Sequence, residues 1–336
     1  MKAVVIHRYG GPEVMRLEDR SPPAAGADDV LIAVRAASLN PIDFKFREHK
    51  VWPMLRPALP ITLGFDVAGV VKQVGTAVTG FSVGAPVFAR IESPRMGALA
   101  ELAAARASVV AALPSRLSFV EAASIPLAGL TALQGLRQVA GLQAGQRVLI
   151  HAGAGGVGSL AIQIAKILGA HVVTTTSTKN VEFCRGLGAD DVIDYTTEDV
   201  AARAKGVDVV FDSLGEDSEI RSLGLVKPGG VVVGIGGLPD GPSARALLPG
   251  FARPIVWWRT RERRRAARVH GTQFKFWLMK PDGAMLSELA AWIEAGRLRP
   301  VVHATYPLDQ FRAAFAELER GRARGKIVVE IAGDNP

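Results

Sequence analysis

The sequence predicts an α/β protein with a β-rich first part followed by a doubly wound parallel sheet. Residues 1–120 contain short segments rich in Val and Ala, such as 30–34 and 66–71, which Gly and Pro separate. That pattern is typical of a compact barrel or sandwich. From about residue 124, strands alternate with Gly-rich turns and helices, as in a parallel sheet with helices on both faces. The candidate strands of this sheet are Arg147–His151, His171–Thr176, Asp191–Asp194, Asp208–Asp212 and Val231–Ile235.

Two domains are expected. The length of 336 residues fits two domains of the usual size, ~150 residues each. After Gly296 the chain returns to a strand, a helix over Leu308–Gly321 and a final strand over Lys326–Ile331. We therefore expect a first domain over 1–123, completed by about 297–336, and a second domain over 124–296.

Composition indicates a folded chain without a membrane span. Hydrophobic residues make up 49% and charged residues 21%, which are ordinary values for a globular protein. The most apolar stretch, 117–136, is interrupted by Glu121, Pro126 and Gly129, so we expect a pair of buried helices there. After Lys2 the chain has a run of only four apolar residues, 3–6, before His7 and Arg8, too few for a secretory signal. A single cysteine, Cys184, forms neither an internal disulfide nor a four-cysteine zinc site, and we expect a cytoplasmic protein.

A glycine-rich motif follows the first strand of the second domain. His151–Gly158 comes directly after the apolar strand 148–150 and opens a helix with apolar residues at helical spacing. In this strand–turn–helix setting GxGxxG predicts a dinucleotide site, because glycines let backbone N–H groups approach a pyrophosphate. The alternative is a glycine-rich structural turn. The residues expected to contact the cofactor are Gly153, Ala154, Gly155, Gly156, Val157 and Gly158.

The end of the next strand favours NADPH over NADH. NAD-binding proteins usually place an acidic residue there to bind the ribose 2′-hydroxyl. This chain has Thr176, Ser177 and Lys179 instead, and no acidic residue before Glu182. Ser177 can donate a hydrogen bond to a 2′-phosphate and Lys179 supplies a positive charge, although a solvated helix start would also explain Lys179. Tyr195, after the following strand, belongs either to the adenosine phosphate pocket or to the surface.

Four further segments carry a family pattern in order along the chain: Ala36–Asp43, Gly64–Gly69, Ser124–Ala132 and Gly325–Val329. Together with the glycine motif they resemble the medium-chain dehydrogenase/reductase superfamily, and within it the zinc-free branch of quinone oxidoreductases and 2-alkenal reductases. The resemblance covers nearly the whole length. It implies a GroES-like first domain, a Rossmann second domain, a cofactor in the cleft between them and a homodimer.

The same resemblance implies that no metal is bound. Zinc-dependent relatives carry a cysteine ligand where this chain has Pro41-Ile42-Asp43, and Gly-His-Glu where it has Gly64-Phe65-Asp66. Without a metal to polarise the oxygen, alcohol oxidation is disfavoured. The implied reaction is hydride transfer from NADPH to a quinone or to the β-carbon of an α,β-unsaturated carbonyl, followed by protonation. The alternatives are an enoyl-thioester reductase and, from another class, a nucleic-acid-binding protein on a dinucleotide-fold scaffold.

By resemblance, Asn40 and Thr131 are the catalytic candidates. Asn40 would lie beside the nicotinamide ribose and the substrate, and Thr131 beside the nicotinamide. The alternatives are an Asn-Pro turn and a threonine bonded to its own helix. Phe44 is expected in the substrate pocket, at a position where many relatives have Tyr. Because a phenylalanine side chain cannot donate a proton, protonation of the product by solvent is favoured. Asp43 and Lys45 are expected to form a surface ion pair.

Two further segments are expected at the cofactor. Residues Ile235 and Gly236 lie in a loop, 234–237, that follows a strand and resembles the family's loop beside the nicotinamide carboxamide. The alternative is an ordinary turn. Lys326 is expected to reach the cofactor from the returning tail.

An arginine-rich segment accounts for most of the net charge. The chain carries +8 overall, and Arg253–Arg268 contains seven arginines and one acidic residue, Glu262. A solvated helix, weak contact with an anionic membrane and nucleic-acid binding would each explain it, and nucleic acid is the least favoured partner. The following segment, Thr272–Trp277, is expected to be an edge strand and a dimer seam.

Overall fold

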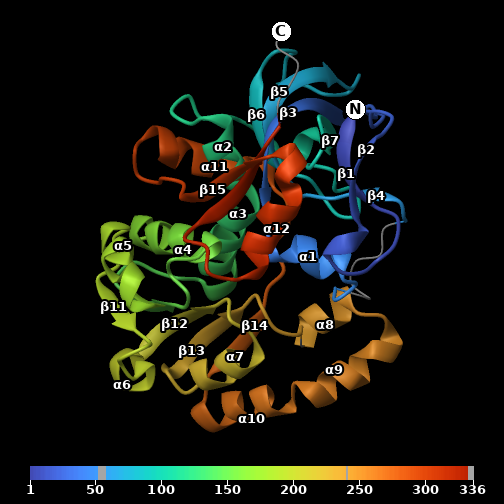
Figure 1. Ribbon diagram of the computed structural model, residues 1–336. Helices are drawn as coiled ribbons and strands as arrows, with labels where there is room; N and C mark the ends of the chain where they lie inside the picture. Colours follow the sequence, from blue (N-terminus) through green and yellow to red (C-terminus); the bar gives the residue numbers. More distant parts are fainter. Residues whose placement is uncertain (52–57, 240, 332–336) are drawn as a thin grey trace. The chain divides into compact units, whose positions relative to one another are not determined.

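The computed structural model describes residues 1–51, 58–239 and 241–331, and the chain forms two compact units. Unit 1 comprises Met1–Leu130 and Lys280–Pro336, and unit 2 comprises Thr131–Met279. Figure 1 shows their helices and strands in the colours of the sequence. No helix within the described ranges is long and apolar enough to cross a membrane.

Unit 1 contains two β-sheets in the described part of the chain. The smaller sheet has the strand order β2-β1-β4, and the larger has the order β15-β16-β3-β5-β6-β8, with β7 also paired to β3. This arrangement confirms the β-rich first domain. The strands are β1 (Lys2–Ile6), β2 (Met15–Asp19), β3 (Asp29–Leu39), β4 (Ile61–Thr62), β5 (Asp66–Val74), β6 (Pro86–Arg90), β7 (Leu102–Arg106), β8 (Val110–Ala112), β15 (Val302–Pro307) and β16 (Lys326–Glu330).

Apolar side chains from both sheets and from the last helix form the core of unit 1. Val4, Ile32, Val67 and Phe315 are fully buried in it. The buried helix pair expected over 117–136 is present as α2 and α3. The helices are α1 (Pro41–Arg47), α2 (Phe119–Ala123), α3 (Pro126–Leu133, which continues into unit 2), α11 (Gly283–Glu294) and α12 (Phe311–Glu319), with 3₁₀ turns at Pro12–Val14, Ala107–Val109 and Leu308–Gln310.

The compact units divide the chain at residues that differ from the expected domain boundaries at two places. Residues 124–130 and 280–296 belong to unit 1, not to the second domain. Helix α11 packs on β8 so closely that a Cβ on Gly283 would lie 2.6 Å from the Val110 carbonyl oxygen. The Leu127 backbone N–H donates to Asp66 at 2.9 Å. Both segments are therefore held by partners that are distant in sequence.

Unit 2 contains a parallel sheet in the order β11-β10-β9-β12-β13-β14, as far as the chain is described. The first strand, β9, lies in the middle, which is the doubly wound Rossmann order and confirms the prediction. The strands are β9 (Arg147–Ile150), β10 (His171–Thr176), β11 (Asp191–Asp194), β12 (Val207–Asp212), β13 (Val226–Gly234) and β14 (Gln273–Phe276). Strand β14 lies at the end of this order, so the expected edge strand is confirmed.

The strands of unit 2 are apolar because helices cover both faces of the sheet. Val148, Val210 and Val232 are fully buried. In Figure 1 helices α9 and α10 follow one another in an arc beyond α7, against which α10 packs. The helices are α4 (Gly156–Ile167), α5 (Val181–Gly186), α6 (Val200–Ala204), α7 (Glu216–Ser222), α8 (Gly241–Leu247), α9 (Arg253–Arg259) and α10 (Arg261–His270), with a π-helical segment at Gln134–Ala140 and 3₁₀ turns at Thr178–Asn180 and Gly250–Ala252.

Candidate functional site

Three strands bring the polar residues of unit 1 together. Strand β3 runs antiparallel to both of its neighbours, β5 and β16, so the end of β3 meets the first residues of both. Asn40 follows β3, Asp66 begins β5 and Lys326 begins β16, and all three residues are buried. Side chains 286 residues apart in the chain therefore meet at one point.

A hydrogen-bond network fixes the Asn40 amide. Asn40 Nδ2 donates to Asp66 Oδ2 at 2.9 Å, and Lys326 Nζ donates to Asn40 Oδ1. Lys326 Nζ also donates to the Leu39 carbonyl oxygen at 2.8 Å and lies 3.5 Å from Asp66 Oδ2. Ser38 Oγ donates to the same Asp66 oxygen at 3.0 Å. These bonds set the amide orientation and use one of the two Nδ2 hydrogens, and burial lowers the pKa of Lys326.

Asp43 and Arg90 bring the number of charged groups buried near Asn40 to four. Asp43 Oδ2 accepts a hydrogen bond from the Asn40 backbone N–H at 2.7 Å, and burial raises the pKa of Asp43 to about 7. Arg90, at the end of β6, lies with its guanidinium 4.4 Å from the centre of the Phe65 ring, and burial lowers its pKa to about 10. The expected surface ion pair of Asp43 with Lys45 is wrong, because Asp43 is fully buried.

The other two candidates expected near the substrate lie in different settings. Phe44 is half-buried and packs against the core of unit 1. Thr131 is buried in α3. Their roles at the nicotinamide and the substrate stay predictions.

In unit 2, close contacts explain two of the three glycines of GxGxxG. A Cβ on Gly158 would lie 2.2 Å from the Ala152 carbonyl oxygen, and a Cβ on Gly153 would lie 2.1 Å from Thr174 Oγ1. At Gly155, which precedes α4, the nearest atom would be 3.3 Å away. The turn therefore leaves no room for a side chain at Gly153 or Gly158. A 12-residue helix, α4, starts in this turn, and its first backbone N–H groups lie there. These features fit a pyrophosphate.

The residues expected at the adenosine phosphate lie at neighbouring strand ends. The Tyr195 backbone N–H donates to the Thr176 carbonyl oxygen at 3.1 Å, so Tyr195 and Ser177 follow adjacent strands, β11 and β10. Lys179 and Tyr195 are exposed and Ser177 is half-buried. The sheet therefore places these residues at one edge, and their contacts with a cofactor stay predictions.

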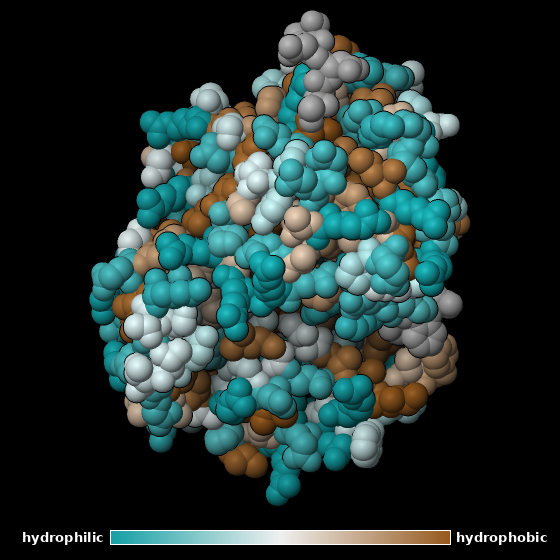
Figure 2. Space-filling view, viewed as in Figure 1, coloured by the Kyte–Doolittle hydropathy of each residue, from teal (hydrophilic) through white to brown (hydrophobic). Residues whose placement is uncertain are grey.

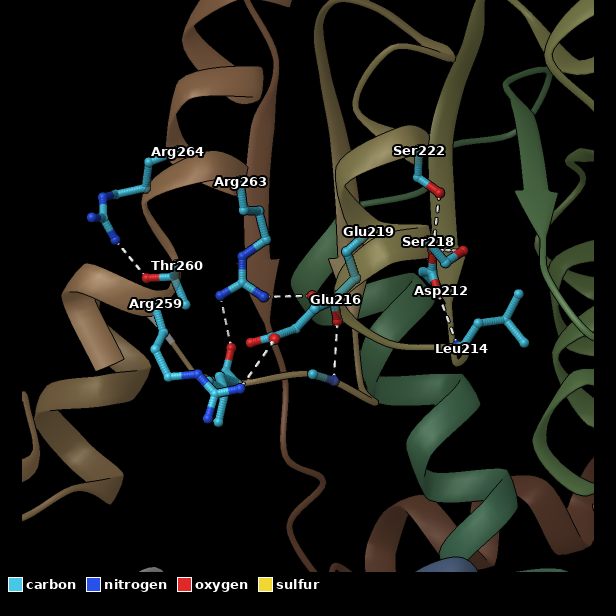
Figure 3. Close-up of polar contacts among 12 residues, drawn as sticks. Asp212, Leu214, Glu216, Ser218, Glu219, Ser222, Arg259, Thr260, Arg263 and Arg264 are labelled. Atoms are coloured by element: carbon cyan, nitrogen blue, oxygen red, sulfur yellow. Dashed lines mark hydrogen bonds and ion pairs between the residues drawn. The ribbon is translucent and has the colours of Figure 1, made fainter. Parts of the chain in front are cut away.

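Sequence reasoning missed a buried histidine network at the same edge. His151, directly after β9, hydrogen-bonds through Nδ1 with Thr175 Oγ1 and through Nε2 with Ser222 Oγ, each at 3.1 Å. Asp212, at the end of β12, accepts hydrogen bonds from Ser218 Oγ at 2.7 Å and Ser222 Oγ at 2.9 Å (Figure 3). Burial lowers the pKa of His151. The signal in the sequence was the position of His151 and Asp212 as the residues that end two parallel strands.

The loop after β13 ends at the same edge of the sheet. The Ile235 backbone N–H donates to the Asp212 carbonyl oxygen at 3.0 Å. A Cβ on Gly236 would lie 3.0 Å from the Ser213 carbonyl oxygen. The loop that was expected to bind the nicotinamide therefore packs on the loop that follows β12.

The arginine-rich segment differs from a simple solvated helix. Arg263 is only 2% exposed, whereas the large apolar residues of the adjoining part are 60–65% exposed. These are Phe251, Ile255, Trp257 and Trp258. Figure 2 shows hydrophobic residues at the surface over the α8–α9 segment, among hydrophilic ones. Among the described residues, no group of three or more His, Cys, Asp and Glu side chains could hold a metal ion.

The chain is similar to known oxidoreductases over nearly its whole length. Residues 26–115 match the family described as alcohol dehydrogenase GroES-like domain, and residues 187–329 match that described as zinc-binding dehydrogenase. A 2-methylene-furan-3-one reductase of Solanum lycopersicum is 38% identical, and a chloroplastic NADPH-dependent alkenal/one oxidoreductase of Arabidopsis thaliana is 37% identical. Each alignment covers 98% of this chain and 79% of the relative. The structure of the quinone oxidoreductase from Coxiella burnetii superposes with a TM-score of 0.86, at 34% identity and 99% coverage of both chains.

Proposed function

The chain belongs to the zinc-free branch of the medium-chain dehydrogenase/reductase family and is an NADPH-dependent reductase of quinones or α,β-unsaturated carbonyl compounds, and from this premise we propose its preferred acceptor and the roles of its residues. We propose that the preferred acceptor is an enal or enone. The observation that carries this proposal is the fixed Asn40 amide, which has one N–H beyond the one that Asp66 accepts. The two relatives at 38% and 37% identity, a methylene-furanone reductase and an alkenal/one oxidoreductase, also support it.

The proposed roles of the residues follow from the contacts within each unit. When bound, NADPH supplies a hydride from C4 of its nicotinamide ring. The Asn40 N–H stabilises the negative charge that develops on the acceptor oxygen when the β-carbon receives the hydride. Lys326 and Asp66 position Asn40. Because Phe44 has no proton to give, water protonates the α-carbon of the resulting enolate.

The cofactor is held, in this proposal, by residues of unit 2 and by α3. Backbone N–H groups of the glycine turn bind the pyrophosphate, and Ser177, Lys179 and Tyr195 bind the adenosine 2′-phosphate. Thr131, Ile235 and Gly236 contact the nicotinamide. Lys326 acts by positioning Asn40, since its ammonium group is already bonded to Asn40 and to the Leu39 carbonyl oxygen.

A panel of acceptors tests this function. NADPH oxidation is measured with enals, enones, quinones and enoyl thioesters, beside a matched NADH series, and kcat/KM is expected to be highest for an enal or enone. Asn40→Ala is expected to lower kcat for enones, whereas Lys45→Ala, in the helix that begins directly after Asn40, leaves it unchanged. Preference for quinones or enoyl thioesters would overturn the acceptor proposal, and no turnover with any acceptor would overturn the reductase function.

We propose that the protein forms a homodimer through β14. This strand pairs with β13 on one side and ends the described strand order, so the backbone groups on its other side can pair with a second copy. Light scattering coupled to gel filtration is expected to give twice the mass of one chain, which is 35.5 kDa. A single-chain mass at micromolar concentration would contradict the proposal.

We also propose weak contact between the α9 region and an anionic membrane surface. Trp257 and Trp258 are exposed, and Arg264 and Arg261 lie over their rings at 4.5 and 4.1 Å. Exposed aromatic rings beside arginines suit a negatively charged lipid interface. Flotation with anionic vesicles at low salt is expected to carry the wild type but not the Trp257→Ser/Trp258→Ser variant. A wild type that stays unbound would refute the contact.

The cytoplasmic location stays a prediction. It is supported by the single buried cysteine, Cys184, which suits a reducing compartment. Fractionation of cells that express the full chain would test it, and recovery in an organelle or a secreted fraction would contradict it.

A further inference from the structure

A buried ion pair lies against the loop that follows β13. Glu219 of α7 is 0% exposed and Arg263 of α10 is 2% exposed. Arg263 Nη1 donates to Glu219 Oε2 at 2.5 Å, and Figure 3 shows the guanidinium directed toward this carboxylate. Of the seven arginines between residues 253 and 268, Arg263 is the one whose charge is buried. A buried charge is stable only with a partner, so the pair acts as one unit.

Both members of the pair also bind the loop backbone. The Gly237 N–H donates to Glu219 Oε1 at 3.1 Å, and Arg263 Nη2 donates to the Leu238 carbonyl oxygen at 2.7 Å. The pair therefore satisfies one donor and one acceptor in consecutive residues of the loop. The other end of the loop is held by the Ile235 N–H, which donates to the Asp212 carbonyl oxygen at 3.0 Å.

Two glycines let the loop approach the carboxylate. A Cβ on Gly234 would lie 2.4 Å from Glu219 Oε1, and a Cβ on Gly237 would lie 2.5 Å from Oε2. On another side, the Phe274 ring of β14 lies 3.8 Å from the Arg263 guanidinium. Glu219 has little freedom to move aside, since it is bonded to Arg263 and enclosed. The position of the loop is therefore coupled to the position of the pair.

We propose that Glu219 and Arg263 are positioning residues that set the loop 235–238 for the nicotinamide end of NADPH. The arginine-rich segment thereby contributes to cofactor binding through one internal residue, apart from anything its exposed arginines do. The inference rests on the proposed function, in which Ile235 and Gly236 contact the nicotinamide. If the pair served only to stabilise unit 2, its loss would weaken binding of the nicotinamide end and of the adenosine end of NADPH equally.

Binding of two ligands separates these roles. NADPH contains the nicotinamide, and 2′,5′-ADP contains only the adenosine phosphates, so their dissociation constants are measured for the wild type and for Glu219→Gln and Arg263→Met. The dissociation constant for NADPH is expected to rise about tenfold, roughly 1.4 kcal/mol, and that for 2′,5′-ADP to change less than about twofold. Arg265→Met, an exposed position on the same helix, is the matched control and is expected to change neither.

A double variant then distinguishes a role of the pair in positioning the loop from a role in stabilising the fold. Each single variant leaves one buried charge or dipole poorly paired, so both are expected to lower the melting temperature. Glu219→Gln/Arg263→Met removes both charges and is expected to recover much of the melting temperature but not the NADPH affinity, because the bond to Leu238 is still missing. Recovery of both together would overturn the positioning role.

The near-isosteric Glu219→Gln variant keeps the inference testable if Arg263→Met fails to fold. Unchanged NADPH affinity in a folded Glu219→Gln protein, or an equal loss of NADPH and 2′,5′-ADP binding, would overturn the inference. A wild type that binds 2′,5′-ADP and NADPH but reduces no acceptor would instead overturn the proposed function. The two failures are therefore distinguishable.

Discussion

Replacing Gly158 by alanine tests whether the glycine turn is closed as the structure shows. The new Cβ would lie 2.2 Å from the Ala152 carbonyl oxygen and 2.8 Å from Gly153 Cα, both backbone atoms. Ordinary contact begins near 3.4 Å, so the turn must move by more than 1 Å. Overpacking of this kind costs about 1–3 kcal/mol. For a domain of this size, that lowers the melting temperature by roughly 2–4 °C per kcal/mol.

Gly155 provides a matched control within the same motif. Its φ of −75° is accessible to alanine, and a Cβ there would come no closer than 3.3 Å to the Ala152 carbonyl oxygen. Gly155→Ala is therefore expected to change the free energy of unfolding by less than about 1 kcal/mol, because a small strain is offset by the lower entropy of the unfolded chain. It is still expected to weaken NADPH binding, since a methyl group would stand where the pyrophosphate approaches.

The assay combines thermal unfolding of both variants without ligand and titration with NADPH. Gly158→Ala is expected to lose stability and affinity, whereas Gly155→Ala is expected to lose affinity alone. A Gly158→Ala protein that melts with the wild type would refute the geometry of the turn. A Gly155→Ala protein with wild-type affinity would refute the placement of the pyrophosphate.

Three further predictions concern charged groups. Burial raises the pKa of Asp43 from 3.8 to about 7. The contribution of protonated Asp43 to the stability of the folded state is therefore complete below pH 3.8 and is lost as the pH rises through 7. The stability of the wild type relative to Asp43→Asn is thus expected to fall by up to roughly 4 kcal/mol between pH 4 and 8 in urea titrations, and a constant difference would contradict it. Lys179→Ala is expected to raise the dissociation constant of NADPH about tenfold and to leave that of NADH unchanged, and equal changes would remove Lys179 from the 2′-phosphate site. Lys326→Met leaves the Asp66 carboxylate without its nearest cation and is expected to lower the free energy of unfolding, measured by calorimetry, by about 3 kcal/mol. Introducing Asp66→Asn together with Lys326→Met is expected to remove this loss.

Local patterns in the sequence predicted the framework of this protein. The alternation of strands and helices after residue 124 predicted the parallel sheet, and GxGxxG between a strand and a helix predicted the turn at Gly153–Gly158. The residues Ser177 and Lys179 predicted NADPH, the cofactor that one named relative uses. Such signals are readable because backbone geometry and strand ends depend on residues that are close together in the chain.

Only the tertiary structure decided which of these polar residues meet. Asn40, Asp66 and Lys326 come together because β3 is antiparallel to both β5 and β16, and nothing local to these residues specifies that pairing. Asp43, for which the sequence predicts a place at the surface, is instead buried and accepts the Asn40 backbone N–H.

The arginine-rich segment shows the same division. Its charge is evident from the sequence, but its seven arginines look alike there, and only the packing of α10 against α7 and β14 buries Arg263 beside Glu219. Sequence therefore determined the elements and the chemistry available to them. The burial of each charge, and with it the partner and pKa of that charge, was decided by contacts between residues far apart in the chain.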